Sequence, residues 1–439
     1  MAVHSLLPPD HPLRSALAAE VHNRPSVAVA SPAVVSCLAL IDADPAAVLA
    51  RVAELATANG LEAPAPGVPH VILEMGGLRL KWERHSEFLS ITVVRPLASE
   101  SEFASGELPG AFDALPEGWL ASLPGTVMAA ADILLLRSEE MPSGTGLLAR
   151  CFEAGPPAGA SVMDGVAQVF TDFRLPASGR TRWVVIDHGM GPEQASRLAQ
   201  RVAEIEIYRM MALLAFPLAR TAFPELDGIE QRLARITTQT EALHAHIGTA
   251  DAQREERRLL DELTRIAAEV ERSVAATSFR FSAAGAYWDI VQARVGEFRE
   301  QRVGDRRTLA GFLSRRMAPA MNSCLAAARR QEELSARVAR ASALLRTRVD
   351  IAREEQNLEL LAAMERRGKA ALRLQQTVEG FSVAALTYYG AGLVGYVGRP
   401  LSAALPWLRN EVLVALSVPV IACLAWYSVR RIRRSLGED

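Results

Sequence analysis

Two stretches near the C-terminus, residues 380–398 and 412–429, contain no charged residue and constrain the fold more than any other feature of the chain. A helix needs about 17–25 mostly apolar residues to cross the hydrocarbon layer of a membrane, so each stretch is just long enough. Trp407, Trp426 and Tyr427 lie where interfacial aromatic side chains are typical. Two helices buried in a protein core would have a similarly apolar sequence, but basic residues flank both stretches. The sequence therefore predicts two transmembrane helices.

The basic residues also set the expected orientation. Four precede the first helix and four follow the second: Arg366, Arg367, Lys369, Arg373, Arg430, Arg431, Arg433 and Arg434. The segment between the helices contains only Arg399 and Arg409. Because basic residues concentrate on the cytoplasmic side of a membrane, we expect both termini in the cytoplasm and the connector on the other side.

Glycines crowd the first predicted transmembrane helix. They are Gly390, Gly392, Gly395 and Gly398. Glycine lowers helix propensity but lets a neighbouring backbone approach closely. The sequence therefore predicts that this helix packs tightly against a neighbour.

Charge and cysteine usage exclude several classes of protein. Charged residues make up 22% of the chain and the formal net charge is -2, so we expect no nucleic-acid partner. The four cysteines include no CxxC pair, which argues against a structural zinc site or a disulfide framework. We therefore expect reduced thiols in a cytoplasmic setting.

Apolar runs of strand length recur in the N-terminal part of the chain. They are residues 34–41, 78–82, 88–94, 132–136, 167–173 and 183–187. Residues 44–60 have a helical pattern with Asp44 as the expected N-cap. This part is predicted to form an α+β or α/β domain. It contains no GxGxxG or GxxxxGK(S/T) motif and no nucleophile elbow, so we assign no enzyme activity.

Long amphipathic helices are predicted after residue 190. Spacings of three and four recur within three sets of residues: Ile229, Leu233, Ile236, Thr240, Leu243 and Ile247; Leu259, Leu263, Ile266 and Val270; and Leu334, Val338, Ala341, Leu345, Val349 and Ala352. This pattern predicts packed antiparallel or coiled-coil helices. The third set continues into the first transmembrane helix without a proline, which predicts one helix from about residue 330 to 397, about 100 Å long at 1.5 Å per residue.

The predicted organisation has six segments. In chain order they are an α+β or α/β cytoplasmic domain (1–190), a long-helix stalk (191–377), the first transmembrane helix (378–397), a short outer connector (398–411), the second transmembrane helix (412–429) and a basic cytoplasmic tail (430–439).

Five segments resemble a bacterial family of predicted membrane-anchored proteins built on a domain of unknown function. They are residues 11–32, 81–88, 164–175, 200–220 and 372–396. Together they span nearly the whole chain. The resemblance implies a multi-pass protein of the bacterial inner membrane and says almost nothing about chemistry.

The overall plan is similar to that of CorA-type magnesium channels. RTRVDIAREEQN at residues 346–357 is similar in register to the CorA stalk, and YYGAGLVGY at residues 388–396 lies near the place of the CorA filter YGMNF. Ala391 and Gly392 stand where that filter has Met and Asn. The resemblance implies a homo-oligomer, a pentamer in the CorA plan, and the missing Asn predicts little selectivity among divalent cations.

One stripe of the first transmembrane helix is a candidate pore lining. Its residues share one side of a helical wheel: Glu379, Ser382, Val383, Leu386, Tyr389 and Gly390. In a ring of subunits, the carboxylates of Glu379 would attract cations. Alternatively, Glu379 reaches the membrane interface or pairs with Arg373.

A second candidate site lies in the segment KWERHSEF. Strand alternation places Lys81, Glu83, His85 and Glu87 on one face. Glu83, His85 and Glu87 together have ligand types that a divalent cation accepts. The more common account is the polar face of a half-buried strand, since one strand rarely supplies a closed metal site.

Two functions are consistent with these features. The first is an oligomeric, CorA-like cation channel gated by its cytoplasmic domain, with a divalent cation as ligand. The second is a membrane-tethered scaffold or sensor without transport activity. The stripe that contains Glu379 separates them, because conduction requires it to face a water-filled axis.

Overall fold

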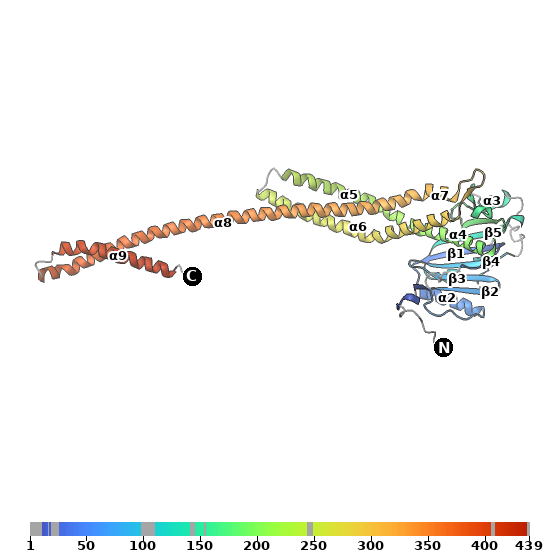
Figure 1. Cartoon of the computed structure of the whole chain (residues 1–439), viewed down its shortest axis with the longest axis horizontal. Helices are drawn as coiled ribbons and strands as arrows, with labels where there is room; N and C mark the ends of the chain where they lie inside the picture. Colours follow the sequence, from blue (N-terminus) through green and yellow to red (C-terminus); the bar gives the residue numbers. More distant parts are fainter. Residues whose placement is uncertain are drawn as a thin grey trace, which may run out of the picture. The chain divides into compact units, whose positions relative to one another are not determined.

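The computed structural model (Figure 1) has two compact units that are interleaved in sequence. The first comprises Met1–Thr238 and Glu262–Ala341, and the second comprises Gln239–Asp261 and Ser342–Asp439. The residues that the structure describes are 11–15, 17–18, 26–97, 110–140, 145–152, 155–243, 249–404 and 409–436.

One mixed sheet forms the centre of the first unit. In the described residues it has nine strands in the order β2-β3-β4-β1-β5-β8-β7-β6-β9. Their bounds are β1 Ala33–Ile41, β2 His70–Met75, β3 Leu78–Arg84, β4 Leu89–Pro96, β5 Thr126–Arg137, β6 Ala158–Val162, β7 Ala167–Thr171, β8 Thr181–Asp187 and β9 Gln301–Arg302. β5 and β8 are parallel, and the other pairs are antiparallel. The mixed α+β class is therefore confirmed.

Strand β1 is apolar along its length because both faces of the sheet are covered. Its side chains alternate between two cores. Val35 and Cys37 pack in the core that contains residues of α4 (Pro192–Leu213), whereas Val34 and Leu38 pack in the core that contains residues of α2 (Pro45–Ala58). The expected N-cap of α2 is confirmed, since Asp44 accepts a hydrogen bond from the backbone N–H of Ala46 (3.1 Å).

The remaining described helices are α3 (Thr145–Cys151), α5 (Ala215–Ala242), α6 (Ala250–Gly296), α7 (Leu309–Arg316), α8 (Ala318–Ala404) and α9 (Asn410–Leu436), with short 3-10 turns at Phe112–Ala114, Leu120–Ser122, Ser138–Glu140 and Met163–Gly165. The expected boundary at residue 190 separates α4 from the sheet, yet α4 contacts β1 and β5. The first predicted helix after that boundary therefore belongs with the sheet.

Helices α5, α6 and α8 pack together within the first unit. The predicted seam is buried at Leu233 of α5, Leu263 of α6 and Leu334 of α8. Polar contacts flank the seam: Gln331 of α8 donates from Nε2 to Thr277 Oγ1 of α6 (3.0 Å). Apolar spacing thus identified the packed faces at these positions. Other members of the three sets are half-buried, namely Thr240, Leu243, Ala341, Val349 and Ala352, and Ile247 lies outside the described residues.

Helix α8 is continuous from Ala318 to Ala404. At 1.5 Å per residue it is about 130 Å long. The predicted unbroken helix over residues 330–397 is therefore confirmed. Residues 405–408 of the expected connector lie outside the described residues, residues 398–404 extend α8, and residues 410–411 begin α9.

In the second unit, α9 packs against the C-terminal part of α8. A Cβ atom on Gly390 would lie 2.8 Å from Ile421 Cγ2, and one on Gly395 would lie 3.3 Å from Val414 Cγ2. A Cβ atom on Gly392 would meet nothing within 4 Å. The predicted close helix approach is thus confirmed at Gly390 and Gly395, while Gly392 points away from it.

Among the described residues, one helix is long and apolar enough to span a membrane, namely Asn410–Arg431. The first expected span, residues 378–397, is helical but does not pass the same test. Its glycines and tyrosines lower its mean hydropathy. The structure therefore shows one apolar helix of spanning length where two were expected.

Candidate functional site

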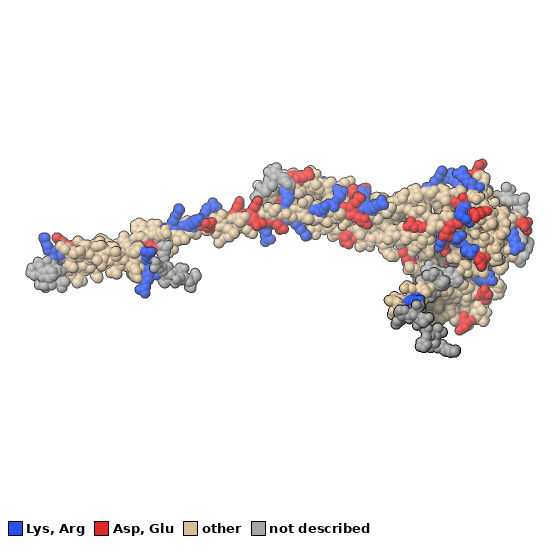
Figure 2. All heavy atoms as spheres, in the orientation of Figure 1, with Lys and Arg blue, Asp and Glu red and all other residues tan. Residues whose placement is uncertain are grey.

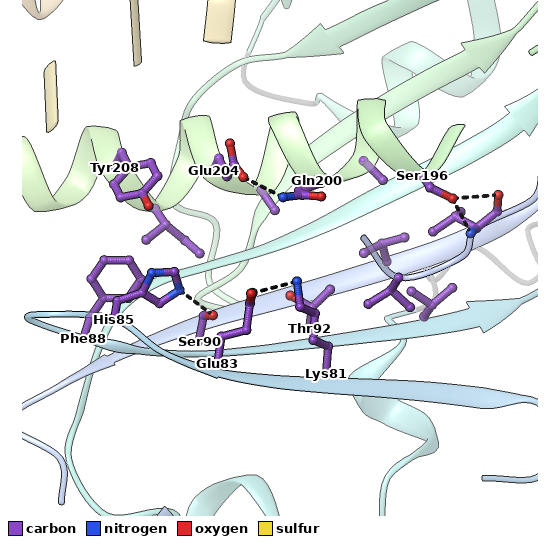
Figure 3. Close-up of a pocket in the computed structure, with 17 residues that line it drawn as sticks. Lys81, Glu83, His85, Phe88, Ser90, Thr92, Ser196, Gln200, Glu204 and Tyr208 are labelled. Atoms are coloured by element: carbon purple, nitrogen blue, oxygen red, sulfur yellow. Dashed lines mark hydrogen bonds and ion pairs between the residues drawn. The ribbon is translucent and has the colours of Figure 1, made fainter. Parts of the chain in front are cut away.

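A small cavity with both apolar and polar lining residues lies between α4 and the sheet (Figure 3). Its volume is about 70 Å³. Its polar lining residues are Lys81, Glu83, His85, Ser90 and Thr92 from the sheet side, and Ser196, Gln200, Glu204 and Tyr208 from α4. One water occupies about 30 Å³ of liquid, and ligand pockets usually measure about 300–1,000 Å³. The cavity therefore suits a few water molecules rather than an organic substrate.

Lys81 and Glu83 form a buried ion pair at this cavity. The distance from Lys81 Nζ to Glu83 Oε1 is 2.8 Å, and the side chains are 5% and 15% exposed. Removing one partner of a buried pair commonly costs about 3–5 kcal/mol, because the other charge is left uncompensated. The polar face expected for this strand thus exists, but α4 covers it.

His85 follows β3 and turns back toward β4. Its ring stacks on Phe88 with centroids 4.2 Å apart, and its Nε2 lies 3.1 Å from Ser90 Oγ. A serine hydroxyl this close to an imidazole can act as a nucleophile with the imidazole as its general base. Because Ser90 is buried and the cavity is small, there is no room for an acyl substrate beside it. The contact therefore supports the turn rather than catalysis.

Glu87 has a partner outside the cavity. It forms an ion pair with Arg280 of α6, and both side chains are largely buried. Burial, reinforced by the charge of Glu87, raises the pKa of Tyr287 to about 12. The pairing places Glu87 at the packing surface between the sheet and α6.

The expected metal site is not assembled. Glu83 pairs with Lys81, His85 contacts Phe88 and Ser90, and Glu87 pairs with Arg280. Within the described ranges, no group of three or more His, Cys, Asp or Glu side chains is placed to hold a metal ion. His85 lines the same cavity as Lys81 and Glu83, as alternation predicts, whereas Glu87 lies beyond the end of β3 at Arg84 and pairs with Arg280 instead.

The candidate pore residues lie on α8. Glu379 accepts a hydrogen bond from Gln375 Nε2 (3.2 Å), and Gly390 faces Ile421 of α9. The other members divide between exposed and half-buried positions: Ser382, Leu386 and Tyr389 are exposed, whereas Val383 is half-buried. Their role as a pore lining stays a prediction.

A polar network on the other face of the sheet was not predicted. Ser36 Oγ donates to Asp132 Oδ1 (2.5 Å), and Arg180 Nε lies 2.8 Å from Asp132 Oδ2. Burial raises the pKa of Asp132, although Ser36 and Arg180 oppose that shift. The sequence signal was present, since Ser36 and Asp132 are polar residues within apolar strands. The network joins β1 and β5 to the turn that precedes β8.

A family model described as a protein of unknown function (DUF3422) matches residues 9–436. The chain therefore belongs to this family, and the resemblance to a family built on a domain of unknown function is confirmed. No curated protein and no solved structure matches the chain.

Proposed function

Since membership of this family assigns no activity, we propose from the structure that the chain is a membrane-tethered sensor or scaffold whose sheet-containing unit lies in the cytoplasm. The observation that carries this proposal is α9. Its segment Asn410–Arg431 is 22 residues long and carries no charge over residues 412–429, and only 6% of its most apolar window is buried within the chain. Apolar surface of this extent requires a membrane or a partner to cover it.

The C-terminal part of α8 supports a second membrane arm. Phe381, Tyr388 and Tyr396 are each more than 70% exposed on it. Figure 2 shows a stretch without charged side chains on the visible face of this region, with basic side chains at its ends. The close approach at Gly390 and Gly395 would let both helices cross the bilayer as one hairpin.

Arginines beside aromatic rings support the positions of the two membrane interfaces. Arg399 lies 5.6 Å from the Tyr396 ring, and Arg430 lies 4.8 Å from the Trp426 ring. Such pairs suit the two membrane interfaces, where amphipathic rings and basic side chains gather. With more basic residues flanking the outer ends of the hairpin, both termini would lie in the cytoplasm of a bacterial cell, with the hairpin in the inner membrane.

A single substitution tests the anchor. Leu416 of α9 and Leu360 of α8 are 66% and 61% exposed, so neither is fixed by core packing. Leu416→Arg should weaken membrane insertion, since arginine costs about 2.5–3.5 kcal/mol at the centre of a spanning helix on insertion scales and somewhat less at Leu416, about one turn from that centre. Leu360→Arg, within the charged part of α8, is the matched control.

The measurement is the fraction of full-length protein that stays with membranes after alkaline carbonate extraction. The wild type and Leu360→Arg should remain in the pellet, whereas Leu416→Arg should be partly released. Equal retention of the two variants, or release of the wild type, would overturn the anchor.

A cation channel is the second candidate. It is favoured by the continuity of α8, which joins the first unit to the apolar arm, with Glu379 half-buried near the start of that arm. It would be a homo-oligomer, with a pentamer as the plan implied by CorA, and its ligand would be a divalent cation. It ranks second because Gly390, one member of the stripe, packs against α9 of the same chain.

Cation flux into proteoliposomes separates the candidates. Glu379→Gln should reduce flux through a channel, because it removes a charge per subunit from a confined entrance. Glu365→Gln, an exposed carboxylate earlier on α8, is the matched control. A monomer in detergent, or the absence of flux for the wild type, would leave the tethered sensor or scaffold.

A further inference from the structure

A second and much larger hollow lies in the first unit. Its volume is about 1070 Å³, at the upper limit of the range of about 300–1,000 Å³ usual for small-molecule sites. Its wall includes residues 172–174 after β7, the last turns of α4, the segment 303–307 and helix α7. We call this hollow the arginine cleft after its main charged residues.

Five guanidinium groups line the arginine cleft in the described residues: Arg174, Arg209, Arg306, Arg307 and Arg316. Two carboxylates accompany them, Asp172 and Asp305. Of the five arginines, only Arg209 forms an ion pair with a carboxylate of the described chain. The cleft therefore has a surplus of positive charge in a concave surface, where field lines are concentrated.

Arg209 is held rigidly at the wall of the cleft. Its Nε donates to Glu206 Oε2 (2.9 Å), and its Nη2 also donates to that carboxylate. Glu206 is only 1% exposed and accepts a further hydrogen bond from Trp183 Nε1 (3.2 Å). Since Glu206 balances its charge, Arg209 contributes an oriented N–H donor rather than net charge.

A tight turn brings Arg306 and Arg307 to the cleft. The backbone N–H of Arg306 donates to the Val303 carbonyl (3.2 Å), and Gly304 has a φ of +54°, which glycine adopts without strain. The Arg307 carbonyl accepts from the Gly159 N–H at 2.8 Å, so the turn is fixed to β6. The guanidinium of Arg306 lies 5.6 Å from the centre of the Phe170 ring.

The cleft also has an apolar wall. The rings of Phe173 and Phe312 stack with centroids 4.9 Å apart, and Pro156 and Pro157 lie nearby in the same lining. Arginines bind phosphate through paired N–H donors, and apolar rings contact the less polar part of a ligand. Both kinds of surface are therefore present in one hollow.

We propose that the arginine cleft binds a phosphorylated small molecule of nucleotide size, with its phosphates on the arginines and its less polar part against Phe312. An anionic lipid headgroup has the same phosphate chemistry, but the cleft is large enough for a whole soluble ligand. This binding does not depend on α9 entering a membrane, so the two proposals fail separately.

The test is calorimetric titration of the full-length protein in detergent micelles with ATP, pyrophosphate and adenosine. The double variant Arg306→Gln and Arg316→Gln should bind ATP at least tenfold more weakly, because a hydrogen bond to a charged group contributes about tenfold or more in affinity. Arg315→Gln is the matched control, since Arg315 is exposed on α7 beside Arg316 and does not line the cleft.

Each outcome decides the proposal. Saturable binding of ATP or pyrophosphate that weakens in the double variant but not in Arg315→Gln supports a phosphate site, and tighter binding of ATP adds a contact with the nucleoside. No saturable binding of either probe at millimolar concentration overturns it, as does equal affinity in the two variants. Micelles with added phosphatidylglycerol form the last arm. Binding of that lipid without competition by ATP or pyrophosphate overturns a soluble ligand.

Discussion

Replacing Gly390 by alanine should loosen the contact between α8 and α9. The added Cβ would lie 2.8 Å from Ile421 Cγ2 and 3.3 Å from its Cδ1, both closer than an ordinary contact. Ile421 is half-buried, and its branched Cγ2 can move only by rotating the whole side chain. Gly392, on the same helix, has open space around its Cβ position and provides the matched control.

The magnitude follows from two opposing effects. Alanine is more favourable than glycine within a helix by about 1 kcal/mol, and both variants share this gain. An extra methyl group forced into a packed contact costs about 1–3 kcal/mol, and only Gly390→Ala incurs this cost. Gly390→Ala should therefore be less stable than Gly392→Ala by about 1–3 kcal/mol.

The free energy of unfolding can be measured in detergent micelles by raising the fraction of SDS and following helical circular dichroism. Gly392→Ala should unfold at the wild-type SDS fraction or above it, and Gly390→Ala should unfold at a lower fraction. Equal midpoints for the two variants would refute the glycine-mediated contact, because only their positions relative to α9 differ.

Asp132→Asn should flatten the pH dependence of stability. Burial raises the pKa of Asp132 in the folded protein, so the native state binds the carboxyl proton more tightly than the unfolded chain does. The protonated carboxyl therefore stabilises the fold below pH ~4, and this stabilisation is lost as the pH rises through the folded pKa. Urea unfolding at several pH values checks this. Leu345→Pro, at a buried position of α8, should lower the free energy of unfolding by about 3 kcal/mol or more and create a protease-sensitive site, and an unchanged variant would contradict a continuous helix. In unfolded protein without detergent, a hydrophilic maleimide should label Cys423. In the native state it should not label Cys37 or Cys151, because both thiols are buried and burial raises their pKa values, to about 11 for Cys151. Mass spectrometry of labelled peptides identifies the labelled cysteines.

Periodicity predicted the helices and the central strands well. The seam at Leu233, Leu263 and Leu334 is buried, and the run that begins at Val34 is an interior strand of the sheet, β1. These predictions succeed because burial leaves a regular trace in the order of apolar residues. The strands β2, β6 and β9 were missed, since they are short and lie toward the edges of the sheet.

The candidate sites could not be predicted as reliably. Lys81 and Glu83 read as the polar face of a strand, and the sequence gives no sign that α4 covers that face. Arg174, Arg209 and Arg316 are far apart in the chain and form one cleft only after folding. Local patterns predict elements, whereas a site depends on which elements meet.

The central claim is that α8 and α9 cross a membrane as a hairpin and leave the first unit in the cytoplasm. Single cysteines tested with an impermeant maleimide examine it most directly, in a chain with Cys423→Ala. Arg409→Cys precedes α9, and Thr347→Cys lies at an exposed position of α8. The hairpin predicts labelling of Arg409→Cys in intact cells and of Thr347→Cys only after permeabilisation. Labelling of Thr347→Cys in intact cells, or of Arg409→Cys only after permeabilisation, would contradict it.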